Sequence, residues 1–452
     1  MKRSFRVFNS LVLLFSLIIL AQLVTYVIPA GEFDRINNQV IRGTYHQVDT
    51  QPLPSYAFLT SIPKGLAAAQ DIIFFVFIVG GVIAVIRASG AIDLLIASAI
   101  KILGSQPVTL IGGMVLLFAL GSSTIGMAEE YLPFVPLLVT MCLALKMDAV
   151  VAVGILYIGA GIGYACAAWN PFTVVIAQNI AGLQIYSGQG VRCLLLLVCT
   201  GVGVHHLMSY VRQVQHNPGN SFVKDIDYSQ GFHMPEDVRF TLSRVLVLVI
   251  FATTIGLFVY GVAAWDWYLT ELMAVFLALA LVVGVISRLT PNAIATTFCR
   301  GAAELTTTAL LIGFARSIQV VLSEARVIDT IINGLAEPLQ LFPSAVAAVG
   351  MLAVQTVCNF FIPSGSGQAF VTMPIMVPLA DLTLVTRQTA VLAYQFGDGF
   401  TNMIVPTNAV LMGVLALAKI PYQRWLRFIF PLLCKLYLVA IAALLVAVKF
   451  GY

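Results

Sequence analysis

Long apolar segments recur along the entire chain, and each is long enough to cross a lipid bilayer as a helix. A helix needs about 20 apolar residues to cross a hydrocarbon core of roughly 30 Å, and it satisfies its own backbone hydrogen bonds there. Of the 452 residues, 60% are hydrophobic and only 10% are charged, so the chain cannot cover itself with a water-soluble surface. The sequence therefore predicts an all-α membrane protein with many spans.

We expect about nine transmembrane helices and two re-entrant hairpins. The hairpins are predicted at 106–145 and 342–384, where the paired apolar arms are too short or too broken to cross. The polar segment 31–64 should lie outside the cell and the polar segment 212–244 in the cytoplasm. With this orientation Lys and Arg are enriched on the cytoplasmic side, as is usual for membrane proteins. This arrangement fits a multi-pass protein of the plasma membrane (the bacterial inner membrane) with a cytoplasmic N-terminus. The crossings are expected near residues 8–30, 71–90, 148–182, 190–211, 244–262, 268–288, 304–324, 386–418 and 426–449.

The second half of the chain repeats the first. Residues 64–94 align without gaps on residues 300–330, and a register that persists over such a length indicates an internal repeat. We therefore predict two repeats, 1–211 and 263–452. A cytoplasmic loop and one linking transmembrane helix, at 212–262, separate the copies and force the second one to enter the membrane upside down.

Each repeat is expected to hold one hairpin followed by one broken helix. In the first repeat the broken helix 148–182 follows the hairpin 106–145, and in the second the broken helix 386–418 follows the hairpin 342–384. Inverted-topology repeats with broken helices are typical of secondary transporters, which bind substrate and ions near the bilayer midplane where the repeats meet. The sequence therefore places the candidate site at the two hairpin tips and the two helix breaks.

Both hairpin tips combine glycines with small hydroxyl side chains. Glycine allows tight turns that expose backbone amides and carbonyls, and small hydroxyls add ligands without blocking approach. Ordinary packing of Ser and Gly between membrane helices is the alternative, and the presence of two matched tips argues against it. The predicted substrate ligands at the tips are Ser122, Ser123, Thr124, Ser364 and Ser366.

Both helix breaks place an asparagine close to a proline. Asn170 precedes Pro171 in the first repeat, and Thr407 and Asn408 follow Pro406 in the second. Each proline removes one backbone donor and interrupts the helix, so nearby carbonyls and helix ends become free to bind an ion or a carboxylate. A kink that only serves packing is the alternative. We predict that Asn170, Thr407 and Asn408 bind substrate.

Three acidic residues lie at membrane depth beside these clusters: Glu129, Glu130 and Asp398. An ionised side chain near the bilayer centre costs roughly 2.5 to 3.5 kcal/mol on insertion scales and is usually functional. We expect these residues to carry the coupling ion, sodium or a proton, or to bind a substrate ammonium group. Arg316 is the nearby candidate for a substrate carboxylate. Solvation of the acids at the hairpin mouth is the alternative.

At these clusters the chain resembles a known family. The runs NFFIPSGSGQ at 359–368 and GFTNMIVPTN at 399–408 resemble the YfcC-like branch of the anaerobic C4-dicarboxylate carrier (DcuC-like) family, and the similarity covers nearly the entire chain. That family belongs to an ion-transporter superfamily with p-aminobenzoyl-glutamate carriers and sodium-coupled dicarboxylate symporters. The resemblance implies a homodimer in which a scaffold domain holds a mobile transport domain, here 106–182 with 342–418.

The hairpin tips depart from the pattern of the sodium-coupled symporters. Those relatives carry Ser-Asn-Thr in both tips, whereas this chain has Ser-Ser-Thr at 122–124 and Ser-Gly-Ser at 364–366. YfcC-like members are described as basic amino-acid antiporters, and the three acids fit such a substrate. We therefore expect an antiporter of a basic or zwitterionic amino acid that works by alternating access. A C4-dicarboxylate carrier driven by sodium or protons is the second possibility.

Other classes of protein fit the sequence less well. All five histidines precede residue 234, so a serine dyad lacks its base and no catalytic residue is predicted. An ion channel or an intramembrane protease stays a minor alternative. The seven cysteines form no C-x-x-C pair, so no metal site is expected, and the net charge of +4 does not indicate nucleic acid. The expected partners are a small-molecule substrate and the lipid bilayer, with no cofactor beyond the coupling ion.

Overall fold

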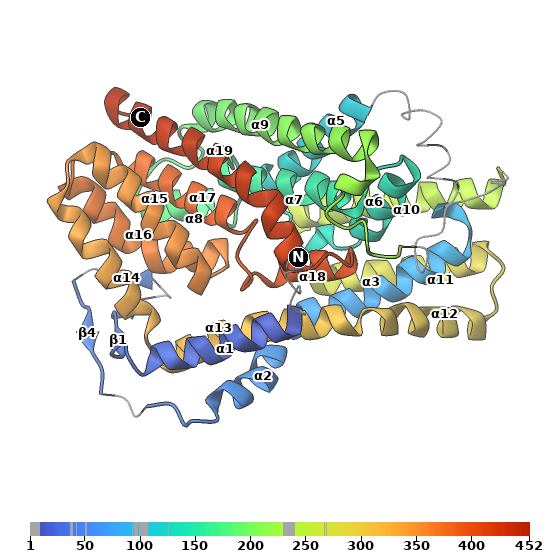
Figure 1. Cartoon of the computed structure of the whole chain (residues 1–452), viewed down its shortest axis with the longest axis horizontal. Helices are drawn as coiled ribbons and strands as arrows, with labels where there is room; N and C mark the ends of the chain where they lie inside the picture. Colours follow the sequence, from blue (N-terminus) through green and yellow to red (C-terminus); the bar gives the residue numbers. More distant parts are fainter. Residues whose placement is uncertain are drawn as a thin grey trace, which may run out of the picture.

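The computed structural model describes residues 10–36, 39–41, 43–49, 52–92, 94, 98, 107–124, 126–228, 240–265, 267 and 269–452. Over these residues it contains eighteen α-helices, three short 3-10 helices and four two-residue strands (Figure 1). The expectation of an all-helical membrane protein is therefore confirmed in its coarse form. Six helices of the described part are long and apolar enough to cross a membrane: α3 (Gln70–Ala88), α9 (Gln189–His216), α11 (Leu269–Ile286), α13 (Thr306–Glu324), α15 (Ser344–Phe361) and α19 (Tyr422–Phe450).

The crossings predicted at 71–90 and 304–324 correspond to α3 and α13, and each of these helices is preceded by a further helix that was not predicted. Helix α2 (Ala57–Ala68) runs into α3 through a break at Ala69, and α12 (Pro291–Glu304) runs into α13 through a break at Leu305. Helix α2 packs against α13, and α3 packs against α12. Glycine makes this approach possible: a Cβ added to Gly80 of α3 would lie 2.7 Å from the Gly301 carbonyl oxygen of α12.

The helices that precede these two pairs, α1 (Ser10–Thr25) and α11, also pack in a corresponding way. Helix α1 lies along α13, and α11 lies along α3, as Figure 1 also shows. Helix α10 (Leu242–Trp265) packs on α11, and α19 packs on both α15 and α9.

The segments predicted as hairpins form pairs of helices, and each predicted helix break lies between two helices. The first arm of the second pair, α15, is long and apolar enough to cross a membrane, whereas a short arm was expected. The first hairpin continues from its tip through a 3-10 turn, and its first predicted residue, 106, lies outside the described residues. Each hairpin packs on the broken helix that follows it. The elements are α5 (Pro107–Thr124), η1 (Glu129–Tyr131), α6 (Phe134–Ala144), α7 (Ala149–Ala165), α8 (Val174–Ile180), α15, α16 (Gly365–Leu382), α17 (Arg387–Thr401) and α18 (Ala409–Leu417).

The two broken helices cross each other inside the molecule. Nearly every residue of α7 and α17 is buried, and the two helices pack directly together. A Cβ on Gly399 of α17 would lie 2.2 Å from the backbone nitrogen of Ala165 at the end of α7. Since real atoms do not approach that closely, this crossing requires glycine.

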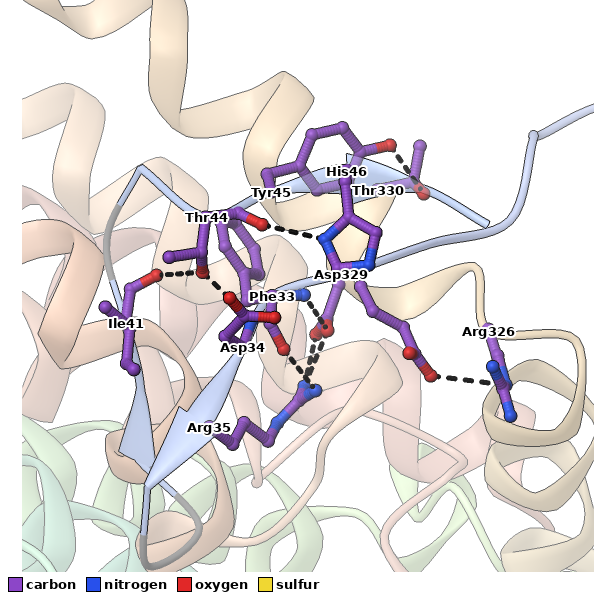
Figure 2. A network of polar contacts seen from close by, with 11 residues as sticks. Phe33, Asp34, Arg35, Ile41, Thr44, Tyr45, His46, Arg326, Asp329 and Thr330 are labelled. Carbon is purple, nitrogen blue, oxygen red and sulfur yellow. Dashed lines mark hydrogen bonds and ion pairs between the residues drawn. The ribbon is translucent and has the colours of Figure 1, made fainter. Parts of the chain in front are cut away.

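The polar segment after α1 is folded onto the start of α14 (Ile328–Ala336), which Figure 2 shows from close by. Strands β1 (Gly31–Glu32) and β4 (His46–Gln47) pair antiparallel, as do β2 (Arg35–Ile36) and β3 (Gln39–Val40). The guanidinium of Arg35 donates to both carboxylate oxygens of the buried Asp329, at 2.6 and 2.7 Å. The backbone nitrogen of Phe33 donates to the same carboxylate at 3.1 Å. We call the described residues 29–36, 39–41 and 43–48 the strap.

The strap and the segments around it were predicted only as polar connections. Besides the ion pair, Tyr45 donates to the hydroxyl of Thr330 at 3.0 Å and Arg326 pairs with Glu32 at 3.2 Å. A 3-10 helix, η3 (Glu337–Leu341), connects α14 to the second hairpin. On the other polar segment, η2 (Pro218–Asn220) follows α9, and much of the predicted cytoplasmic loop beyond it lies outside the described residues.

Candidate functional site

A cavity of about 520 Å³ opens where the hairpin tips and the broken helices meet. That volume is typical of a site for a small molecule, roughly 300 to 1,000 Å³. Its lining comes from the end of α2, the start of α3, α13, both hairpin tips, α7 and the two helix breaks. Of the predicted site residues, Glu129, Glu130, Ser364, Ser366, Thr407 and Asn408 line this cavity.

The other predicted residues of the first repeat hold the tip of hairpin 1 in place and do not line the cavity. The side-chain amide of Asn170 donates to the Ser122 carbonyl at 2.8 Å. The hydroxyl of Ser123 accepts from the backbone nitrogen of Ala168 at 3.2 Å. The hydroxyl of Thr124 donates back to Leu120 within its own helix, at 2.6 Å. Asn170 and Ser123 therefore tie the tip to the first helix break.

A glycine turn brings the two glutamates to the cavity. Gly126 has φ +73, a left-handed conformation that glycine adopts freely. The carboxylate of Glu130 is buried and accepts from the backbone nitrogen of Ala128 at 2.7 Å. Glu129 is half-buried, and its carboxylate accepts from the N–H of its own backbone. Glu129 is therefore the more accessible acid of this pair.

Two helices start at the cavity in the second repeat. Ser364 caps the N-terminus of α16, and Asn408 caps α18 by accepting from the backbone nitrogen of Leu411 at 2.9 Å. The hydroxyl of Ser366, in the first turn of α16, has no hydrogen-bond partner among the described residues. Helix N-termini carry unpaired N–H groups and a partial positive charge, so they bind anions such as a carboxylate. Thr407 donates to the Phe360 carbonyl at 2.8 Å and joins the break to hairpin 2.

Asp398 lies one layer behind the lining, with 1% of its surface exposed. Its Oδ1 atom accepts from the side-chain amides of Asn359, at 2.9 Å, and Asn402, at 3.0 Å. Asn402 lines the cavity and in turn accepts from the amide of Asn408 at 2.7 Å. Asp398 is therefore linked to the cavity wall through two asparagines.

Two charged residues from outside the hairpins and broken helices complete the lining. Asp71 lies in the first turn of α3, and Arg316 lies in α13. Arg316 donates to Gln319 of its own helix at 2.6 Å. Within the described part of the chain, neither residue forms an ion pair, and the same holds for Glu129 and Glu130. The cavity thus holds three carboxylates and one guanidinium that form no ion pair with a described residue.

Five residues that were not predicted as site residues also line the cavity: Asp71, Tyr157, Tyr164, Thr173 and Asn402. Asp71 could have been found from its position, because it is an acid at the start of the apolar run predicted to cross the membrane at 71–90. The described residues contain no group of three or more His, Cys, Asp or Glu that could hold a metal ion.

Comparisons with known proteins agree with the sequence resemblance. Residues 8–449 match the model of a family described as C4-dicarboxylate anaerobic carrier. The chain is 33% identical to YfcC of Escherichia coli (strain K12), which carries the provisional name of a basic amino acid antiporter, over 98% of this chain and 97% of that protein. It is 30% identical to an uncharacterized protein of Haemophilus influenzae, over 99% and 98% of the two chains.

Two solved transporters are similar over nearly the full length. The alignment with the YdaH transporter of Alcanivorax borkumensis covers 98% of this chain and 99% of that protein, with 14% identity and a TM-score of 0.43. The alignment with MtrF of Neisseria gonorrhoeae, described with a class of antimetabolite efflux pumps, covers 98% of this chain and 95% of that protein, with 17% identity and a TM-score of 0.43. The full-length family match, together with the relatives at 33% and 30% identity, shows that this chain belongs to the C4-dicarboxylate anaerobic carrier family of multi-pass membrane transport proteins.

Proposed function

We propose that this protein is a secondary antiporter of a basic amino acid, which it exchanges across the membrane by alternating access. The observation that carries the proposal is the charge of the cavity: Asp71, Glu129 and Glu130 face one guanidinium, that of Arg316. A cleft lined mainly by one sign of charge concentrates ligands of the opposite sign. The name of the Escherichia coli relative, a basic amino acid antiporter, points the same way.

The lining offers complementary groups for both ends of such a substrate. The carboxylates suit the α-ammonium group and the cationic side chain. The α-carboxylate would lie at Arg316 and the first turns of α16 and α18, because helix N-termini and guanidinium groups both favour carboxylates. Ser366, whose hydroxyl is free, would add a hydrogen bond. A basic amino acid, with two positive groups and one carboxylate, thus provides a partner of opposite charge for Arg316 and for two of the three acids.

The packing of helices supports two inverted repeats with a moving and a fixed part. Helix α2 packs on α13 as α12 packs on α3, and α1 packs on α13 as α11 packs on α3. We propose that the hairpins and broken helices, 106–182 with 342–418, move against the remaining helices. Arg316 and Asp71 would then stay on the fixed side, so that closure around the substrate brings the two sets of charges together.

A C4-dicarboxylate is the second candidate, and the description of the family favours it. The charge of the cavity argues against it, because a dicarboxylate needs two cationic partners and would face three carboxylates. The two substrates can be separated by one assay.

The experiment is counterflow in proteoliposomes that are preloaded with unlabelled substrate and diluted into labelled arginine. Internal arginine or ornithine should accelerate uptake, and internal succinate should not. Glu129→Gln should slow this exchange, whereas Glu304→Gln, an exposed acid on α12 outside the cavity, should leave it unchanged. Exchange of succinate without exchange of arginine would overturn the proposal in favour of the dicarboxylate.

A further inference from the structure

We propose that the surface formed by α9 and α19 binds the headgroup of an anionic phospholipid, with the ammonium group of Lys435 as its deepest contact. Helices α9 and α19 pack against each other, as Figure 1 also shows, and neither helix lines the substrate cavity. The inference therefore goes beyond the proposed transport function and does not depend on it.

Lys435 lies inside the part of α19 that is long and apolar enough to cross the membrane. The nearest charged residues along the helix are Arg427 and Lys449. At 1.5 Å per residue, Lys435 is roughly 12 Å from Arg427 and roughly 21 Å from Lys449 along the helix axis. An ionised lysine at such a depth is costly and requires a counter-charge.

No acidic partner for Lys435 is present in the described part of the chain. Its side chain is exposed and takes part in no ion pair there. Neither α9 nor α19 contains an Asp or Glu. On the same helix, Phe430 and Leu438 are 57% and 68% exposed, so the surroundings of Lys435 are apolar. The counter-charge therefore has to come from a ligand.

The neighbouring surface of α9 adds two groups that can carry a positive charge. The His206 ring lies against Phe428 of α19, with Nε2 at 3.1 Å from the Phe428 carbonyl oxygen. Lys435 lies two turns beyond Phe428 and thus on the same side of α19. The charges of Lys435 and of His205 both act on His206. The surface therefore attracts an anion to the line where α9 and α19 meet.

Two arginines continue this series of cations towards the membrane surface. Arg427 precedes Lys435 on α19, and Arg212 follows His206 on α9, which runs antiparallel to α19. Both arginines are exposed. Helical side chains point towards the N-terminus of their helix, and long cationic side chains extend towards the interface. The ammonium of Lys435 is therefore directed towards the level of Arg427, and a phosphate group between them would be bound from both sides.

An anionic phospholipid matches both the charges and the apolar surroundings. Its phosphate supplies the negative charge, and its acyl chains would cover exposed apolar side chains such as Phe430 and Leu438. Basic surfaces between membrane helices bind anionic headgroups in this way. A second copy of the chain fits less well, because a two-fold contact through this surface would place its cations opposite those of the partner. A water-soluble anion gains nothing from the apolar side chains.

The test measures thermal unfolding of the purified protein in a non-ionic detergent with added phosphatidylglycerol or phosphatidylcholine. Phosphatidylglycerol should raise the unfolding midpoint more than phosphatidylcholine. Lys435→Gln should raise the phosphatidylglycerol concentration needed for half of this effect by about tenfold or more, because one charged contact to phosphate is lost. Lys435→Arg keeps the charge and should keep the effect. Lys449→Gln is the matched control, because Lys449 is an exposed lysine near the opposite end of the same helix.

Equal stabilisation by the two lipids, or equal effects of Lys435→Gln and Lys449→Gln, would overturn the lipid site. Equal stabilisation by inorganic phosphate would overturn it in favour of a soluble anion. A dimer that dissociates in Lys435→Gln, without any lipid preference, would assign the surface to a second copy of the chain. No transport is measured, so absent arginine exchange would refute the proposed function and leave the lipid site standing.

Discussion

The guanidinium of Arg316 should account for most of the recognition of a substrate carboxylate. It lines the cavity, and among the described residues it donates a hydrogen bond only to the neutral Gln319, so its other donors remain available. Arg316→Gln removes the charge while keeping a polar side chain. A hydrogen bond between charged groups contributes about 1.5 to 3 kcal/mol, which corresponds to a rise in KM of about 10- to 150-fold.

The assay compares two substrates that differ only at the carboxylate. Counterflow is measured in proteoliposomes with arginine and with agmatine, the amine that remains when arginine loses its carboxyl group. Wild-type protein should prefer arginine by roughly the factor above. In Arg316→Gln the KM for arginine should rise to near that for agmatine, while the KM for agmatine should stay the same.

The matched control is Arg300→Gln, on α12. Arg300 is exposed and does not line the cavity, so its loss should change neither KM. If Arg316→Gln raises the KM for arginine and the KM for agmatine by the same factor, the guanidinium acts through the shape or the total charge of the cavity. The assignment of the carboxylate to Arg316 would then be wrong.

Three further predictions concern stability, measured as the thermal unfolding midpoint in detergent. Gly399→Ala should destabilise the protein by about 1 to 3 kcal/mol, because a Cβ would lie 2.2 Å from the Ala165 nitrogen. Asp329→Asn should lower the free energy of unfolding by about 1 to 2 kcal/mol, because it removes the negative charge that pairs with the half-exposed guanidinium of Arg35 in the strap. A hydrogen bond from Arg424 lowers the pKa of Asp225, so Asp225→Asn should be less stable than the wild type at neutral pH. That difference should disappear as the pH falls below about 4, where the wild-type carboxylate becomes protonated.

The sequence predicts a helix break well where proline and glycine mark it. Pro171 and Pro406 identify the two broken helices, and the structure places a break beside each of them. The breaks at Ala69 and Leu305 carry neither residue type, and both arise from the packing of α2 on α13 and of α3 on α12. Apolar runs alone cannot reveal such breaks, because each half is hydrophobic in the same way.

The site was harder to predict than the fold because a polar residue in a membrane segment has two possible roles. Ser123 and Asn170 were expected to bind substrate, and in the structure their polar atoms bind the backbone of their own repeat. Ser366 and Asn408 carry the same residue types and do line the cavity. Which polar groups remain free depends on tertiary contacts that no local pattern contains.

The two repeats therefore use similar sequences for different tasks. At the first tip, Asn170 and Ser123 satisfy the turn, so that tip is held rigidly against its helix break. At the second tip, the hydroxyl of Ser366 has no hydrogen-bond partner among the described residues. Unsatisfied polar groups in a buried site are favourable only when a ligand completes them, so we expect ligand binding to act mainly on the second hairpin. The strap is pinned to α14, just before that hairpin, and would resist its movement. In this arrangement, substrate binding would favour movement of the same hairpin that the strap restrains.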